Sequence, residues 1–132
     1  MHPYLRAYMA GVALPTMVVP FVIAALTLQH PDRHAFRLEE VVIFPVGLVP
    51  SAWGLWNVLH AWSRRCRQIP IGLFGALLVF VLGPLAFALQ LGLDKVIWTP
   101  SLIAVGLPLT IAVYYLAWKH VVGRFNDILG IG

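Results

Sequence analysis

Residues 69–93, IPIGLFGALLVFVLGPLAFALQLGL, form the stretch that decides the fold, because they contain no Asp, Glu, Lys or Arg. A transmembrane α-helix needs about 20 apolar residues to cross the ~30 Å hydrocarbon core of a bilayer, and this run is long enough. Three further stretches, approximately 8–28, 41–61 and 100–122, have similar lengths and no charge in their central two thirds. The sequence therefore predicts four transmembrane helices.

The overall composition agrees with this prediction. Of the 132 residues, 61% are apolar and only 11% are charged, against roughly a quarter charged in soluble domains. Soluble monomers rarely expose contiguous apolar patches beyond a few hundred Å², so the excess apolar surface must face lipid or a larger partner. We expect an all-α integral membrane protein in which residues 1–132 form a single four-helix transmembrane domain.

The connections between the apolar stretches are short, which makes consecutive helices antiparallel neighbours. Thr99 followed by Pro100 predicts a helix start, with an N-cap hydroxyl and a proline in the first turn. The second and fourth stretches each contain Val-Gly-Leu followed by a proline, at 46–50 and 105–108. This likeness raises the alternative that the chain consists of two related hairpins.

Lys and Arg in the short loops predict the orientation, because cytoplasmic loops carry the excess of these residues. Six lie on one side and three on the other, so we expect the N- and C-termini on the cytoplasmic side of an inner or plasma membrane. The basic residues lie between apolar runs, unlike the basic stripe of a nucleic-acid-binding protein. The six are Arg6, Arg64, Arg65, Arg67, Lys119 and Arg124, and the three are Arg33, Arg37 and Lys95.

Three arginines, Arg64, Arg65 and Arg67, stand together on the predicted cytoplasmic rim. Basic residues next to a membrane attract anionic lipids with about 1 kcal/mol for each charge. We therefore expect anionic lipids to bind at this cluster.

One proline in each stretch lies at a common depth: Pro20, Pro50, Pro84 and Pro108 are about nine residues, or roughly 13 Å, from the outer end of their helices. A proline inside a helix removes one backbone donor and bends the helix. We predict a kink in every span, and the four prolines are candidates for a shared hinge layer or for a polar collar that lines an outward-opening cavity. The alternative is a static bundle, because prolines are commoner in membrane helices than in soluble ones.

Four polar residues are the candidates for lining a path near this layer: Thr16, Ser51, Asn57 and Thr110. No carboxylate lies at mid-membrane depth, which argues against proton-coupled exchange through an embedded acid. Asn57 is the neutral side chain that costs most to bury in a membrane, and an interhelical hydrogen-bond partner explains it better than a ligand does.

The histidines and acidic residues are only weak indications of a zinc or haem site, and we predict no cofactor. His30, Asp32 and His34 are competent zinc ligands, but Pro31 prevents helical spacing from placing them together. His60 and His120 lie near the cytoplasmic helix ends, where two imidazoles are able to hold haem iron. Histidines beside cations at helix ends are usually solvated.

The leading functional hypothesis is a small oligomeric transporter or channel-like protein, because four helices alone enclose little more than their own side chains. Its solute would be small, neutral, and weakly polar or lipid-like, since no charge lies in the central two thirds of any span. The alternative is a non-catalytic membrane subunit or assembly partner of a larger complex. A third hypothesis is a histidine-based haem or metal membrane enzyme, although no nucleophile motif is present and we do not expect an enzyme.

Overall fold

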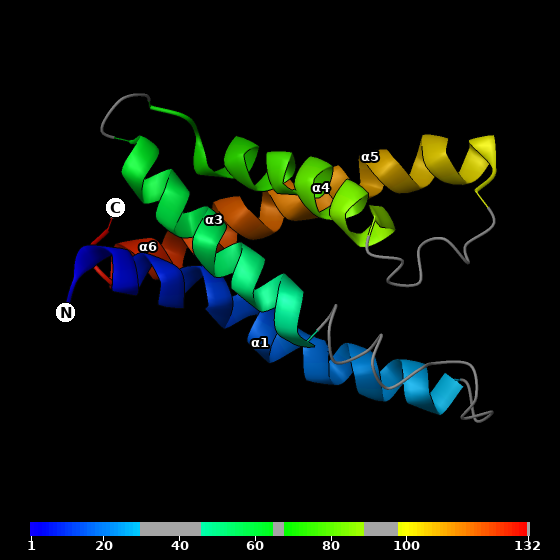
Figure 1. The fold of residues 1–132 in the computed structure, drawn as a ribbon, viewed down its shortest axis with the longest axis horizontal. Helices are drawn as coiled ribbons and strands as arrows, with labels where there is room; N and C mark the ends of the chain where they lie inside the picture. The colour runs from blue at the N-terminus through cyan, green and yellow to red at the C-terminus, as the bar shows by residue number, and fades with distance from the viewer. Residues whose placement is uncertain (30–45, 65–67, 89–97, 132) are drawn as a thin grey trace.

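The computed structural model describes residues 1–29, 46–64, 68–88 and 98–131, and these ranges contain helices and no strands (Figure 1). The all-α class predicted from the sequence is therefore confirmed. The elements are α1 (Pro3–Gln29), α3 (Val49–Ser63), α4 (Ile71–Ala88), α5 (Pro100–Ala117), the π-helix η3 (Trp118–Val122) and α6 (Gly123–Ile128).

Within the described ranges, three helical segments are long and apolar enough to cross a membrane: Pro3–Ala25, Ile71–Ala88 and Pro100–Ile128. They correspond to the first, third and fourth predicted spans and fit a membrane location. The second predicted span, 41–61, is described only from residue 46, and α3 itself has 15 residues. Residues 41–45 of this predicted span lie outside the described residues.

Two helix ends differ from the ends predicted by hydropathy. The first helix begins at Pro3, where the fixed φ of proline suits a first helical turn, rather than near Tyr8. The last helical segment continues past Val122 through η3 and α6 to Ile128. The added turn contains Asn126, which is buried against other helices, so tertiary contacts extend the helix beyond the apolar run.

The predicted start of the last helix is confirmed. The Thr99 hydroxyl accepts a hydrogen bond from the backbone N–H of Leu102 at 3.2 Å, and Pro100 occupies the first turn. Elsewhere α1 continues through Pro20, and α5 through Pro108. Pro50 instead lies in the first turn of α3, directly after a π-helical stretch at 46–48.

The helices associate as two pairs, α1 with α3 and α4 with α5. Figure 1 shows the pairs together at the end of the molecule that holds both termini and apart at the opposite end. The α1–α3 pair is close because glycines face each other: a Cβ on Gly11 would lie 2.9 Å from the Cα of Gly54. Small residues that let helix backbones approach are typical of membrane helix packing.

An aromatic core joins the two pairs where they meet. The Trp53 ring lies 5.1 Å from the ring of Tyr114 and 5.4 Å from that of Trp118, measured between centroids. Trp118 is fully buried, and its side chain covers Gly75 so closely that an added Cβ would collide with it. This core anchors η3 against α3 and α4, and so positions the polar residues beyond it.

Candidate functional site

A buried polar cluster, here called the Asn57–Asn126 cluster, lies beyond the aromatic core and joins three helices. Asn57 of α3 donates through Nδ2 to the carbonyl oxygen of Ala7 in α1 at 2.7 Å and to Oδ1 of Asn126 in α6 at 2.8 Å. Asn126 donates in return to Oδ1 of Asn57 at 3.1 Å. Asn57 is 0% exposed and Asn126 5% exposed. Both Nδ2 hydrogens of Asn57 are used, so its carboxamide serves packing between helices.

The C-terminal residues are held against the same end of the bundle by two arginines. Arg6 donates through Nη1 to the carbonyl oxygen of Leu129 at 3.3 Å, and Arg64 through Nη1 to that of Ile131 at 3.0 Å. Gly130 takes a φ of 69°, a conformation that favours glycine and ends the helix. The C-terminal residues are thus hydrogen-bonded to α1 and to the end of α3.

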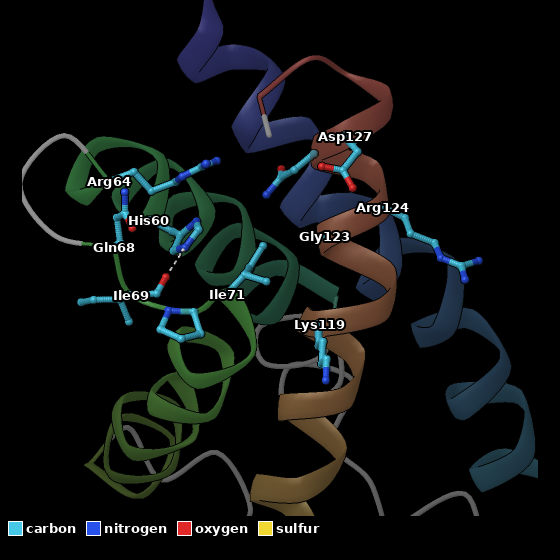
Figure 2. A pocket seen from close by; sticks show the side chains of 11 residues that line it. His60, Arg64, Gln68, Ile69, Ile71, Lys119, Gly123, Arg124 and Asp127 are labelled. Atoms are coloured by element: carbon cyan, nitrogen blue, oxygen red, sulfur yellow. Dashed lines mark hydrogen bonds between the residues drawn. The ribbon is translucent and has the colours of Figure 1, made fainter.

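Beside the Asn57–Asn126 cluster lies a cavity of about 620 Å³, here called the basic pocket. It is bounded by the end of α3, by residues 68–71 at the start of α4, and by the η3–α6 segment (Figure 2). His60 is 5% exposed; one of its ring nitrogens, Nε2, lies 3.2 Å from the carbonyl oxygen of Ile69, and its ring lies 5.1 Å from that of Phe74. These contacts hold the His60 ring in place, and it forms one side of the pocket.

The charged residues of the basic pocket are predominantly cationic. Among the described residues that line it, Arg64, Lys119 and Arg124 are the cations and Asp127 is the one carboxylate. Figure 2 shows Arg124 leaving the helix on the side away from His60, so it stands at the rim. Among the residues that the structure describes, Lys119 contacts only the Tyr115 ring, with Nζ 5.8 Å from the centroid, and no ion pair neutralises it.

The π-helical turn η3 helps to bring Lys119 and Arg124 to the same pocket. In a regular α-helix, residues five apart lie about 140° apart around the axis. Hydrogen bonds in a π-helix run from residue i to i+5, and here the N–H of Gly123 donates to the carbonyl oxygen of Trp118. The wider turn makes the angle between the two residues smaller than in an α-helix, so both line the pocket, with Arg124 at its rim.

Two apolar grooves lie at the level of the predicted proline layer. The α1–α3 groove, of about 500 Å³, is lined by Thr16, Pro20 and Pro50 together with aliphatic side chains. The α4–α5 groove, of about 610 Å³, contains Pro84 and Thr110 among aliphatic and aromatic side chains. The structure thus brings five of the predicted path residues into two separate grooves within one chain.

The groove hydroxyls are already hydrogen-bonded to their own helices. Thr16 donates to the carbonyl oxygen of Val12 at 2.7 Å, and Thr110 to that of Gly106 at 2.8 Å. Each hydroxyl retains acceptor capacity but offers no free donor. The grooves suit a solute that is mostly apolar.

The remaining predicted residues are dispersed. Ser51 and Pro108 are exposed and line neither groove. Asn57 lies in the Asn57–Asn126 cluster. His60 is buried while His120 is exposed. The described part of the chain holds no group of three potential metal ligands. His30, Asp32, His34, Arg65 and Arg67 lie outside the described residues.

Sequence reasoning missed Asn126, and it treated Lys119 only as a marker of orientation. A signal for Asn126 does exist, because Trp118, Val122 and Asn126 follow one another at four-residue spacing. That spacing places them on one helix face, and all three are buried. The apolar run ends at Val122, so hydropathy alone does not indicate that the helix continues to Asn126.

Comparison with protein-family models, with curated proteins and with solved structures finds no match for this chain.

Proposed function

We propose that this chain is a small oligomeric membrane protein that takes up a lipid-like or other weakly polar neutral solute in its intramembrane grooves. In this proposal the chain crosses the membrane four times with alternating direction, and both termini face the cytoplasm. The observation that carries the proposal is the α4–α5 groove, an apolar cavity of about 610 Å³ within a candidate membrane-spanning pair. This volume falls within the roughly 300–1,000 Å³ of small-molecule sites.

Two glycines support the groove as an open binding space. A Cβ added to Gly83 of α4 or to Gly106 of α5 would meet no heavy atom within 4 Å, and both residues line the groove. In contrast, the glycines at helix contacts, such as Gly75, have no room for a Cβ. A glycine that packs against nothing leaves space for another molecule.

The prolines support the proposal that the groove walls move. Pro20 and Pro50 share the α1–α3 groove, and Pro84 lies in the α4–α5 groove. Proline weakens the helical hydrogen-bond ladder at its own level, so we propose that the helices bend there as the grooves open and close.

Oligomerisation is proposed because one chain leaves much of its helical surface uncovered. No residue of α5 is buried, and Val105 is 68% exposed. Contacts between copies would cover part of this surface and would bring grooves of neighbouring chains together.

Filling the α4–α5 groove tests the transport proposal. Gly106→Leu and Gly83→Leu fill it from opposite walls, whereas Ala112→Leu adds a side chain on α5 outside the groove. Proteoliposomes would be assayed for transbilayer movement of a fluorescent short-chain phosphatidylcholine and for glycerol uptake. We expect the protein to accelerate at least one probe, both groove variants to abolish the effect, and Ala112→Leu to retain it with an unchanged oligomeric state.

Failure of the wild-type protein to accelerate either probe above empty liposomes would contradict the proposal. Equal rates in Gly106→Leu and wild type would contradict the groove as the route.

The exposed surface of α5 also favours a second candidate function, that of a non-catalytic membrane subunit. An apolar helix with no buried residue would then pack against a different protein. Purification in mild detergent separates the two proposals, because a stable homo-oligomer supports the first, while constant copurification of one foreign subunit supports the second.

A further inference from the structure

We propose that the basic pocket binds the phosphate group of an anionic phospholipid. The proposal is independent of solute uptake, because the pocket and the two grooves have no lining residue in common.

The cations of the pocket supply the anion specificity. Arg64 and Lys119 approach the cavity from different helices, and Arg124 adds charge at the rim. Asp127 is the only opposing carboxylate among the lining residues that the structure describes. Counting these groups gives three positive charges and one negative charge, a net of +2. Arginine and lysine are the usual phosphate ligands, with arginine donating in a fork and lysine acting as a point charge.

Lys119 has the position and freedom needed to reach a lipid phosphate. It follows Pro100 by 19 positions, which is about 28 Å along a helix at 1.5 Å for each residue. This length matches the thickness of the hydrocarbon core, so a span that begins at Pro100 would place Lys119 at the level of the headgroups. It is exposed, and its one described partner is an aromatic ring.

An apolar wall beside these charges fits a lipid better than a free anion. Ile69, Pro70 and Ile71 line the side of the pocket at the start of α4, where the helix enters its apolar span. A cavity of about 620 Å³ is much larger than inorganic phosphate requires. A headgroup phosphate in the pocket would therefore leave the glycerol backbone and acyl chains against these aliphatic residues and the adjoining membrane.

Binding of short-chain lipids in detergent solution tests the assignment. The probes are a short-chain phosphatidylglycerol, a phosphatidylcholine of the same chain length, and glycerol phosphate, each titrated against the full-length protein. We expect phosphatidylglycerol to bind best. Each cation near a membrane surface contributes about 1 kcal/mol, so Lys119→Gln should weaken this binding about fivefold, while Lys119→Arg should preserve it.

Two further variants separate binding from folding. Asp127→Asn removes the opposing carboxylate and should tighten phosphatidylglycerol binding, a gain that misfolding cannot produce. Arg33→Gln removes one positive charge from the predicted loop on the other side of the membrane and should leave affinity unchanged.

Two results would overturn the proposal. One is equal affinity of wild type and Lys119→Gln for phosphatidylglycerol. The other is glycerol phosphate binding as tightly as the lipid, which would assign the pocket to a soluble phosphate compound.

Discussion

The carboxamides of Asn57 and Asn126 donate hydrogen bonds to each other, at 2.8 and 3.1 Å, although 69 positions separate them in the sequence. Together with the bond from Asn57 to the carbonyl oxygen of Ala7, they join α3, α6 and α1 at one buried point. This point closes the end of the bundle beside the basic pocket, so the pocket depends on the pairing of these two residues.

The first prediction concerns this pair. Asn126→Leu leaves one N–H and the Oδ1 of Asn57 without hydrogen-bond partners. This loss should lower the free energy of unfolding by about 1–2 kcal/mol. Asn57→Leu should have a similar or larger effect. The double variant should cost less than the sum of the single variants, because no orphaned carboxamide remains. Unfolding in mixed detergent micelles measures all four proteins, and strict additivity would contradict the reciprocal pairing.

The second prediction compares two glycines of α4. Gly75→Ala forces a methyl group into the buried Trp118 side chain and should destabilise the protein by about 1–3 kcal/mol through overpacking. Gly83→Ala is the matched control, because its Cβ would meet nothing within 4 Å. We expect its stability to differ from wild type by less than about 0.5 kcal/mol. Equal effects of the two substitutions would be incompatible with the described contact.

The third prediction concerns the C-terminal residues. Arg6→Gln and Arg64→Gln remove the donors to Leu129 and Ile131, each bond contributing about 1 kcal/mol. We expect faster amide hydrogen exchange at residues 128–131, with little change in exchange within α4. Arg124→Gln serves as control, because Arg124 makes no described hydrogen bond to these residues. Unchanged exchange in the double variant would mean that the two arginines do not hold the C-terminus.

Much of the fold was predictable because lipid imposes simple rules on sequence. The uninterrupted run at 69–93 predicted the helix found at Ile71–Ala88, and Thr99 with Pro100 predicted the start of α5. Both depend on local chemistry, namely apolar length and helix capping, which a single sequence displays directly.

Features that depend on long-range packing were not predictable in the same way. Hydropathy ended the last helix at Val122, because nothing near Asn126 in the sequence indicates that its partner is Asn57. The prolines were predicted at one depth, but their separation into two grooves follows from the pairing of α1 with α3 and α4 with α5. Likewise, Lys119 and Arg64 meet at one pocket only because η3 packs on α3 and α4.

The central proposal, that this chain crosses the membrane repeatedly with both termini in the cytoplasm, is tested most directly by cysteine accessibility. Cys66 is the single native cysteine, and Arg33→Cys in a Cys66→Ser background supplies a second site in a different predicted loop. We expect a membrane-impermeant maleimide applied to intact cells to label the Arg33→Cys protein and to label Cys66 only after the inner face is exposed. Labelling of both positions from the same side would contradict the account.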